Sequence, residues 1–300
     1  MIFKSFSLLL LSSMLMMLPA HAQFAFQKGD KVCIIGNSLS DRMQFDSWME
    51  TLIHRGAPEL ELIFRNISAC GDEVAKRPRS ENVPNGEALL AECKADVIFC
   101  FFGYNESFQG QAGIEKFKND YSAMIDSYKA KNFNGKNTLR FVLFSPIACE
   151  NLKTKLVPDG SANNNRIALY VNAIKEVAEA KKETFVDLFQ PTLDIYGKAK
   201  TPLTINGVHL SSEGNRQLGM VIAEALLKKK MQTLATDEKL REAVNAKNVY
   251  WHNAYRPADS NDIFGNRSGL SFEKGQSNGQ VLRHEITMWK QMTANRDPQI

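Results

Sequence analysis

In Val32-Cys33-Ile34-Ile35-Gly36-Asn37-Ser38-Leu39-Ser40-Asp41, a short apolar run leads directly into a polar turn. The apolar part predicts a buried strand over 31–35, and Ser38 follows at its carboxyl end. A second signal is the later segment Asn206-Gly207-Val208-His209-Leu210. A serine hydroxyl is a poor nucleophile unless a base lies beside it. Ser38 and His209 are therefore our candidates for a nucleophile and its general base.

Strand-like and helix-like segments alternate along the rest of the chain. We expect further strands at 60–66, 97–102, 139–145 and 184–188, and helices at 44–55, 86–93, 113–130, 163–181 and 211–229. Near-continuous apolar runs are typical of parallel strands covered on both faces. The alternation predicts an α/β fold, a three-layer doubly wound parallel sheet of about five strands. Ligands bind such sheets beyond the carboxyl ends of the strands.

The two ends of the chain differ from this central part. Lys4, the apolar run 8–18 and the site Ala20-His21-Ala22 are typical of a secretory signal peptide. The apolar run is shorter than the ~18–20 residues that a membrane span needs. We therefore expect a signal peptide at 1–22, a main domain at 23–230 and a partly helical C-terminal extension at 231–300. The localisation that follows is periplasmic or extracellular, with no membrane span after signal removal.

Charge and cysteine content exclude several classes of function. The chain has 37 basic and 33 acidic residues, a balance that does not indicate nucleic-acid binding. Its five cysteines are odd in number and have no CxxC spacing, so we expect no zinc or other metal site. Cys70 and Cys149 fall in loops, and a disulfide between them stays an open alternative for an exported protein. The oligomeric state is left open by the sequence.

Acyl transfer also needs hydrogen-bond donors directed at the oxyanion of the tetrahedral intermediate. The candidates are the backbone N–H of Ser38, the backbone N–H of Gly71 and the side-chain amide of Asn105. Taken singly, each has an ordinary structural interpretation as a helix cap or a turn residue. Each of the three donors follows a different predicted strand. Because ligands bind beyond the carboxyl ends of these strands, this arrangement favours one shared site.

These segments resemble the motif blocks of the SGNH hydrolases, also called GDSL-type esterases and lipases. The matching segments are Gly36-Asn37-Ser38-Leu39-Ser40, 66–71, Gly103-Tyr104-Asn105-Glu106 and Asn206-Gly207-Val208-His209. Asn37, Glu106 and Asn206 stand where the family pattern has aspartate. The resemblance covers roughly residues 30–229 and implies the flavodoxin-like sheet of that family.

The resemblance also implies roles for individual residues. Ser38 would be the nucleophile and His209 the general base, while Ser38, Gly71 and Asn105 would form the oxyanion hole. The implied activity is cofactor-free hydrolysis of small acyl esters, for example acetyl esters, on a small-molecule or carbohydrate substrate.

Asn206 stands where the family has the aspartate that orients the histidine. It accepts a hydrogen bond through its carbonyl but supplies no negative charge, so three alternatives stay open. The site works as a weaker Ser–His dyad; or another carboxylate substitutes, the candidates being Asp41, Asp72, Glu106 and Asp187; or the domain is a binding module without turnover. A separate hypothesis is an interaction protein whose C-terminal extension is the functional part.

Overall fold

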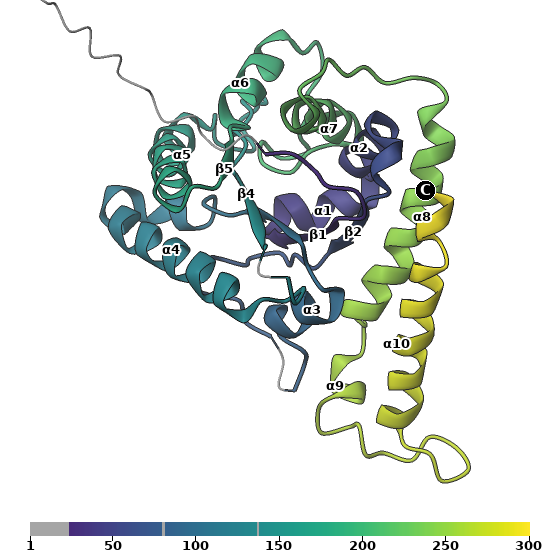
Figure 1. The fold of residues 1–300 in the computed structure, drawn as a ribbon. Helices are drawn as coiled ribbons and strands as arrows, with labels where there is room; N and C mark the ends of the chain where they lie inside the picture. Colours follow the sequence, from purple (N-terminus) through teal and green to yellow (C-terminus); the bar gives the residue numbers. More distant parts are fainter. Residues whose placement is uncertain (1–23, 80–81, 137) are drawn as a thin grey trace, which may run out of the picture.

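The computed structural model describes residues 24–79, 82–136 and 138–300 (Figure 1). The predicted signal peptide lies outside the described residues. Within them, no helix has the length and apolar character needed to cross a membrane. All five cysteines are free thiols, with Cys149 buried and Cys70 exposed, so the alternative of a disulfide between these two is not realised here.

The centre of the fold is a parallel sheet of five strands in the order β2-β1-β3-β4-β5. The strands are β1 (Lys31–Gly36), β2 (Ile63–Asn66), β3 (Val97–Phe101), β4 (Arg140–Phe144) and β5 (Thr184–Val186). All residues of β3 are buried, because helices cover both faces of the sheet. The chain runs outward in opposite directions from β1 and β3, which makes their junction the switch point of a doubly wound sheet. The predicted α/β three-layer fold is confirmed.

Helices form a layer on each face of the sheet. One layer contains α2 (Trp48–Gly56) and α7 (Ser212–Leu227), and the other contains α3 (Gly86–Cys93), α4 (Ile114–Lys131) and α5 (Ser161–Lys181). Side chains of each strand alternate between the layers. Phe99 of β3, for example, packs in the core with α2 and α7, whereas Ile98 packs in the core with α3, α4 and α5. Shorter elements join these parts: α1 (Ser38–Asp46), α6 (Phe189–Lys198) and the 3-10 segments η1 (Pro58–Leu60) and η2 (Glu106–Gly113).

The single helix expected at 44–55 is wrong in its extent, because the chain breaks at Ser47. Ser47 has a left-handed backbone with φ 59°, and it separates α1 from α2. Its hydroxyl hydrogen-bonds to the Gln44 carbonyl and to the side-chain carbonyl of Asn245, both at 2.9 Å. The segment before the break forms a separate helix, α1, which begins at Ser38.

The C-terminal extension contains α8 (Asp237–Tyr255), α9 (Ser260–Ile263), α10 (Asn278–Ala294) and η3 (Asp297–Gln299). Figure 1 shows α8 and α10 side by side next to β2, and α8 contacts α1, α2 and β2. The Lys247 amine pairs with the buried Glu50 carboxylate. The Trp251 indole donates to the Asn66 carbonyl at 2.7 Å, and the Tyr255 hydroxyl donates to the Ser68 carbonyl at 3.1 Å. The extension therefore covers the β2 edge of the sheet.

Candidate active site

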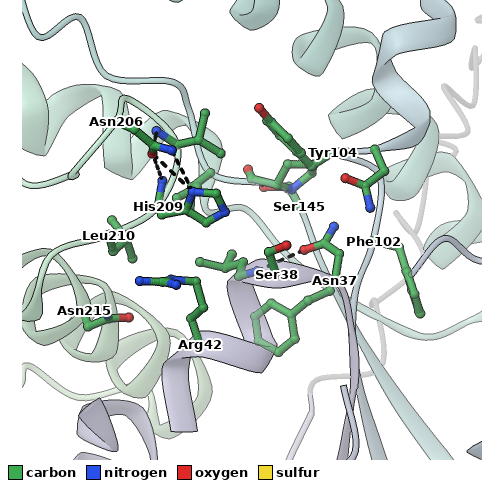
Figure 2. Close-up of a pocket in the computed structure, with 16 residues that line it drawn as sticks. Asn37, Ser38, Arg42, Phe102, Tyr104, Ser145, Asn206, His209, Leu210 and Asn215 are labelled. Atoms are coloured by element: carbon green, nitrogen blue, oxygen red, sulfur yellow. Dashed lines mark hydrogen bonds between the residues drawn. The ribbon is translucent and has the colours of Figure 1, made fainter. Parts of the chain in front are cut away.

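A pocket of about 370 Å³ lies at the carboxyl ends of β1, β3 and β4. Its lining comes from four separated segments of the chain and includes Ser38, Asn105, Asn206 and His209 (Figure 2). Gly71 does not line this pocket. The topology thus brings together four of the five residues that the motifs singled out.

Ser38 is placed by the tight turn between β1 and α1. A Cβ on Gly36 would lie 2.5 Å from the Phe101 carbonyl oxygen, so only glycine lets β1 end this close to β3. The next residue, Asn37, donates its backbone N–H to that same carbonyl at 3.1 Å. Its side chain caps α1 by accepting the Leu39 N–H at 3.2 Å. Ser38 is consequently the first residue of α1 and lies half-buried in the pocket.

The candidate oxyanion donors lie on neighbouring loops. Within the described residues, the backbone N–H groups of Ser38 and Gly71 have no hydrogen-bond acceptor, as is usual for Ser38's position in the first turn of a helix. Asn105 donates its side-chain amide to the Asp72 carbonyl at 3.1 Å, which ties its loop to the loop of Gly71. The buried Glu106 carboxylate braces the same two loops, since it accepts the Val74 N–H at 2.8 Å and the Gly103 N–H at 2.9 Å.

His209 and Asn206 contact each other through a short turn. The Asn206 Oδ1 accepts the backbone N–H of His209 at 2.9 Å and that of Val208 at 3.2 Å, and these two donors fix the orientation of the amide. Asn206 Nδ2 then lies 2.9 Å from His209 Nδ1, with Oδ1 at 3.2 Å from the same atom. An amide nitrogen only donates. The shorter contact therefore favours the imidazole tautomer that carries its proton on Nε2.

The opposite edge of the imidazole faces into the pocket on the side of Ser38 (Figure 2). The structure has no hydrogen bond between Ser38 and His209, and catalytic hydrogen bonds are often long in unliganded sites. Burial lowers the pKa of His209, and the positive charge of Arg42 lowers it further. His209 is therefore neutral at pH 7, which a general base requires.

A family model described as GDSL-like Lipase/Acylhydrolase matches residues 34–217, more than half of the chain. The chain belongs to this family. The matched range contains all the candidate site residues and ends before the C-terminal extension. A search among curated proteins found no match.

Solved structures share the acylhydrolase fold at low identity. A catalytic mutant of an acetylxylan esterase from Geobacillus stearothermophilus is 18% identical with a TM-score of 0.51, and the alignment covers 70% of this chain and 100% of that one. A GDSL-like lipase from Parabacteroides merdae is 16% identical with a TM-score of 0.51, covering 69% and 100%. A gut microbial diltiazem-metabolizing enzyme is 18% identical with a TM-score of 0.51, covering 69% of this chain and about half (48%) of that one. At these identities the likeness shows the fold alone.

Among the described residues, no carboxylate lines the pocket or bonds to His209 in place of the aspartate of the family pattern. Asp41 pairs with Arg256 and accepts the Cys70 thiol at 2.9 Å, and Asp187 accepts the Phe189 N–H at 2.8 Å. The other two candidates are engaged elsewhere, Glu106 with the backbone N–H groups described above and Asp72 with Arg79. None of the four lines the pocket or bonds to His209. The structure therefore places none of the four candidate carboxylates against His209.

Two residues that the motifs did not single out contribute to the site. The buried Glu150 carboxylate accepts the backbone N–H groups of Leu203 and Thr204 and the Thr204 hydroxyl, which holds the segment leading to His209. Its own N–H donates to the Gly207 carbonyl at 2.8 Å. Arg42 lines the pocket from α1. A signal for Arg42 was available, because residues four apart lie on the same face of a helix and Ser38 is four positions earlier.

Proposed function

We propose that this protein is an exported esterase that hydrolyses small acyl esters, for example acetyl esters on a carbohydrate, through an acyl-Ser38 intermediate. The observation that carries the proposal is the meeting of Ser38, with its unpaired backbone N–H, and His209 around one pocket that Asn105 also lines. A pocket of about 370 Å³ suits a small acyl group. The fold neighbour described as an acetylxylan esterase supports the carbohydrate ester, and the signal-peptide pattern supports export.

In the proposed reaction, Ser38 Oγ attacks the ester carbonyl carbon while His209 Nε2 takes the hydroxyl proton. The oxyanion accepts hydrogen bonds from the backbone N–H of Ser38 and from the side-chain amide of Asn105, both of which line the pocket. Collapse of the intermediate breaks the bond to the alcohol, and His209 returns its proton to the alcohol oxygen. Water then attacks the acyl-serine by the same route, releasing the carboxylic acid and restoring the Ser38 hydroxyl.

Asn206 limits the rate of this reaction. Nε2 accepts the serine proton only when the imidazole carries its own proton on Nδ1, and that tautomer must use the Asn206 Oδ1 at 3.2 Å. The same oxygen already accepts two backbone N–H groups. We therefore propose a Ser–His dyad of modest activity, in which each turnover first requires the less favoured tautomer.

A second candidate function is an ester-binding module without turnover. The observation that favours it is the 2.9 Å contact between Asn206 Nδ2 and His209 Nδ1, which places the imidazole proton on Nε2, where it blocks proton transfer from Ser38.

Covalent labelling separates the two functions. We expect a fluorophosphonate probe to modify Ser38 in the mature protein, as mapped by mass spectrometry, and p-nitrophenyl acetate hydrolysis to fall to background in Ser38→Ala. Ser127→Ala, at an exposed position of α4, is the matched control and should keep both signals. A folded wild type without label, whose hydrolysis equals that of Ser38→Ala, would establish the binding module instead.

A further inference from the structure

Arg42 brings an uncompensated positive charge to the pocket. It lies one helical turn after Ser38 in α1, and no described residue forms a hydrogen bond or ion pair with its guanidinium. The carboxylate at the next i+4 position, Asp46, is already bound by the Ser212 hydroxyl at 2.6 Å and by the Asn215 amide at 2.8 Å. Figure 2 shows the Arg42 side chain directed toward Leu210 and Asn215, on the same side of the pocket as His209.

The rest of the pocket does not balance this charge. Among the described residues that line it, none is an aspartate or a glutamate, and Arg42 is the one arginine or lysine. His209 is neutral at pH 7, because burial and Arg42 lower its pKa. The formal charge of the pocket lining at neutral pH is therefore +1, next to the candidate nucleophile.

Asn206 contributes to the same electrostatic pattern. In the family, an aspartate at this position would place a negative charge in the lining, where it would repel an anionic ligand. The asparagine removes that repulsion, although it costs the histidine its charged partner. The unpaired arginine and the uncharged Asn206 both favour an anion in the pocket.

We propose that Arg42 binds a carboxylate of the substrate, so that the esters cleaved at Ser38 carry an anionic carboxylate on either the acyl group or the alcohol. The inference rests on the proposed function and names its substrate class. A guanidinium matches a carboxylate with two parallel N–H···O bonds and stays charged at every relevant pH. Because the same α1 helix carries Ser38 and Arg42, a bound carboxylate sets the position of the ester relative to the nucleophile.

The test compares kcat/KM for matched charged and neutral esters at pH 8, where His209 is neutral. Monomethyl succinate against methyl butyrate places the carboxylate on the acyl side, and 4-acetoxybenzoate against 4-acetoxybenzamide places it on the alcohol side. We expect wild type to prefer the charged ester in one of the two pairs. Arg42→Gln should reduce that preference about 2- to 5-fold, because Arg42 is exposed and solvent screens its charge, and Arg42→Lys should retain part of it.

Arg267→Gln is the matched control, since it removes an exposed arginine outside the pocket and should leave the preference unchanged. A wild type that prefers neither charged ester, or a preference that survives in Arg42→Gln, would overturn the inference.

A binding measurement makes the inference independent of turnover. Calorimetry with succinate and with 4-hydroxybenzoate, using Ser38→Ala and Ser38→Ala/Arg42→Gln, reports carboxylate binding without hydrolysis. Binding that depends on Arg42 supports the inference even when no ester is cleaved, in which case only the proposed function fails. Hydrolysis of neutral esters without any carboxylate binding supports the proposed function and rejects the inference.

Discussion

Replacing Asn206 by aspartate should convert the dyad into a faster triad. In the wild type, Oδ1 accepts two backbone N–H groups, and Nδ2 faces His209 Nδ1 at 2.9 Å. Asn206→Asp puts a second carboxylate oxygen where Nδ2 now lies. The imidazole then donates its Nδ1 proton to that oxygen, and Nε2 becomes free to accept the Ser38 proton.

The size of the gain follows from the tautomer and the charge. The reverse change in a Ser-His-Asp triad lowers kcat about 10⁴-fold. Asn206 is exposed, so solvent screens the new charge. We therefore expect a rise in kcat/KM for p-nitrophenyl acetate of about 10²-fold, which corresponds to about 2.7 kcal/mol of transition-state stabilisation.

The pH profile gives a second measure of the same change. A base works only when deprotonated, so activity rises with pH through the pKa of His209. Burial and Arg42 hold that pKa below its usual range in the wild type. The aspartate favours the imidazolium and raises the pKa, so the acid limb of Asn206→Asp should move to higher pH.

The control for this experiment is Asn151→Asp. Asn151 also accepts a backbone N–H of its own loop, at 2.8 Å, and it does not line the pocket. It should change neither the rate nor the acid limb. An Asn206→Asp variant with wild-type rate and an unshifted acid limb would refute the assignment of His209 as a base restrained by its tautomer.

Two further predictions concern stability, measured by urea unfolding. Glu150→Ala leaves the buried Leu203 and Thr204 donors without an acceptor and should cost about 2–4 kcal/mol, while Glu150→Gln recovers part of the loss; equal stability of all three proteins would contradict the bracing of the His209 segment. Lys247→Ala leaves the buried Glu50 carboxylate without its cation and should cost about 3–5 kcal/mol. Burial raises the pKa of Glu50, but Lys247 and His54 together outweigh burial and bring this pKa to about 2. The stabilisation is therefore complete above the unfolded pKa and is lost as the pH falls toward 2. If the free energies of unfolding of wild type and Lys247→Ala change in parallel from pH 6 to pH 3, the pair does not make this contribution.

The sheet could be predicted from the sequence because its strands are short apolar runs buried on both faces. The expected 97–102 and 139–145 agree closely with β3 and β4. The predicted ends of strands and helices were wrong where a left-handed backbone conformation sets the end of an element. The strand expected from residue 60 begins only at Ile63, since η1 ends in a left-handed Glu61 with φ 49°. The sequence around Ser47 does not predict a helix break, because the contact that stabilises its conformation comes from α8, about 200 positions later in the chain.

The candidate site was predictable only where the family's motif residues lie. Ser38, Asn105, Asn206 and His209 follow strand ends whose convergence the α/β pattern already predicts. Glu150 carries no motif, and its partners Leu203 and Thr204 come from a segment about 50 positions later. The unpaired state of Arg42 likewise depends on Asp46 being bound by α7, which no local pattern shows.

The cover that α8 places on β2 has a consequence for biosynthesis. Asn66, Ser68 and Glu50 emerge from the ribosome early, but their respective partners Trp251, Tyr255 and Lys247 follow only about 190 residues later. Until then the outermost strand of the sheet stays open to pairing with other chains. The β2 edge of the sheet is therefore completed only after α8 has been synthesised, and a chain stopped at residue 230 would present that open strand to its neighbours.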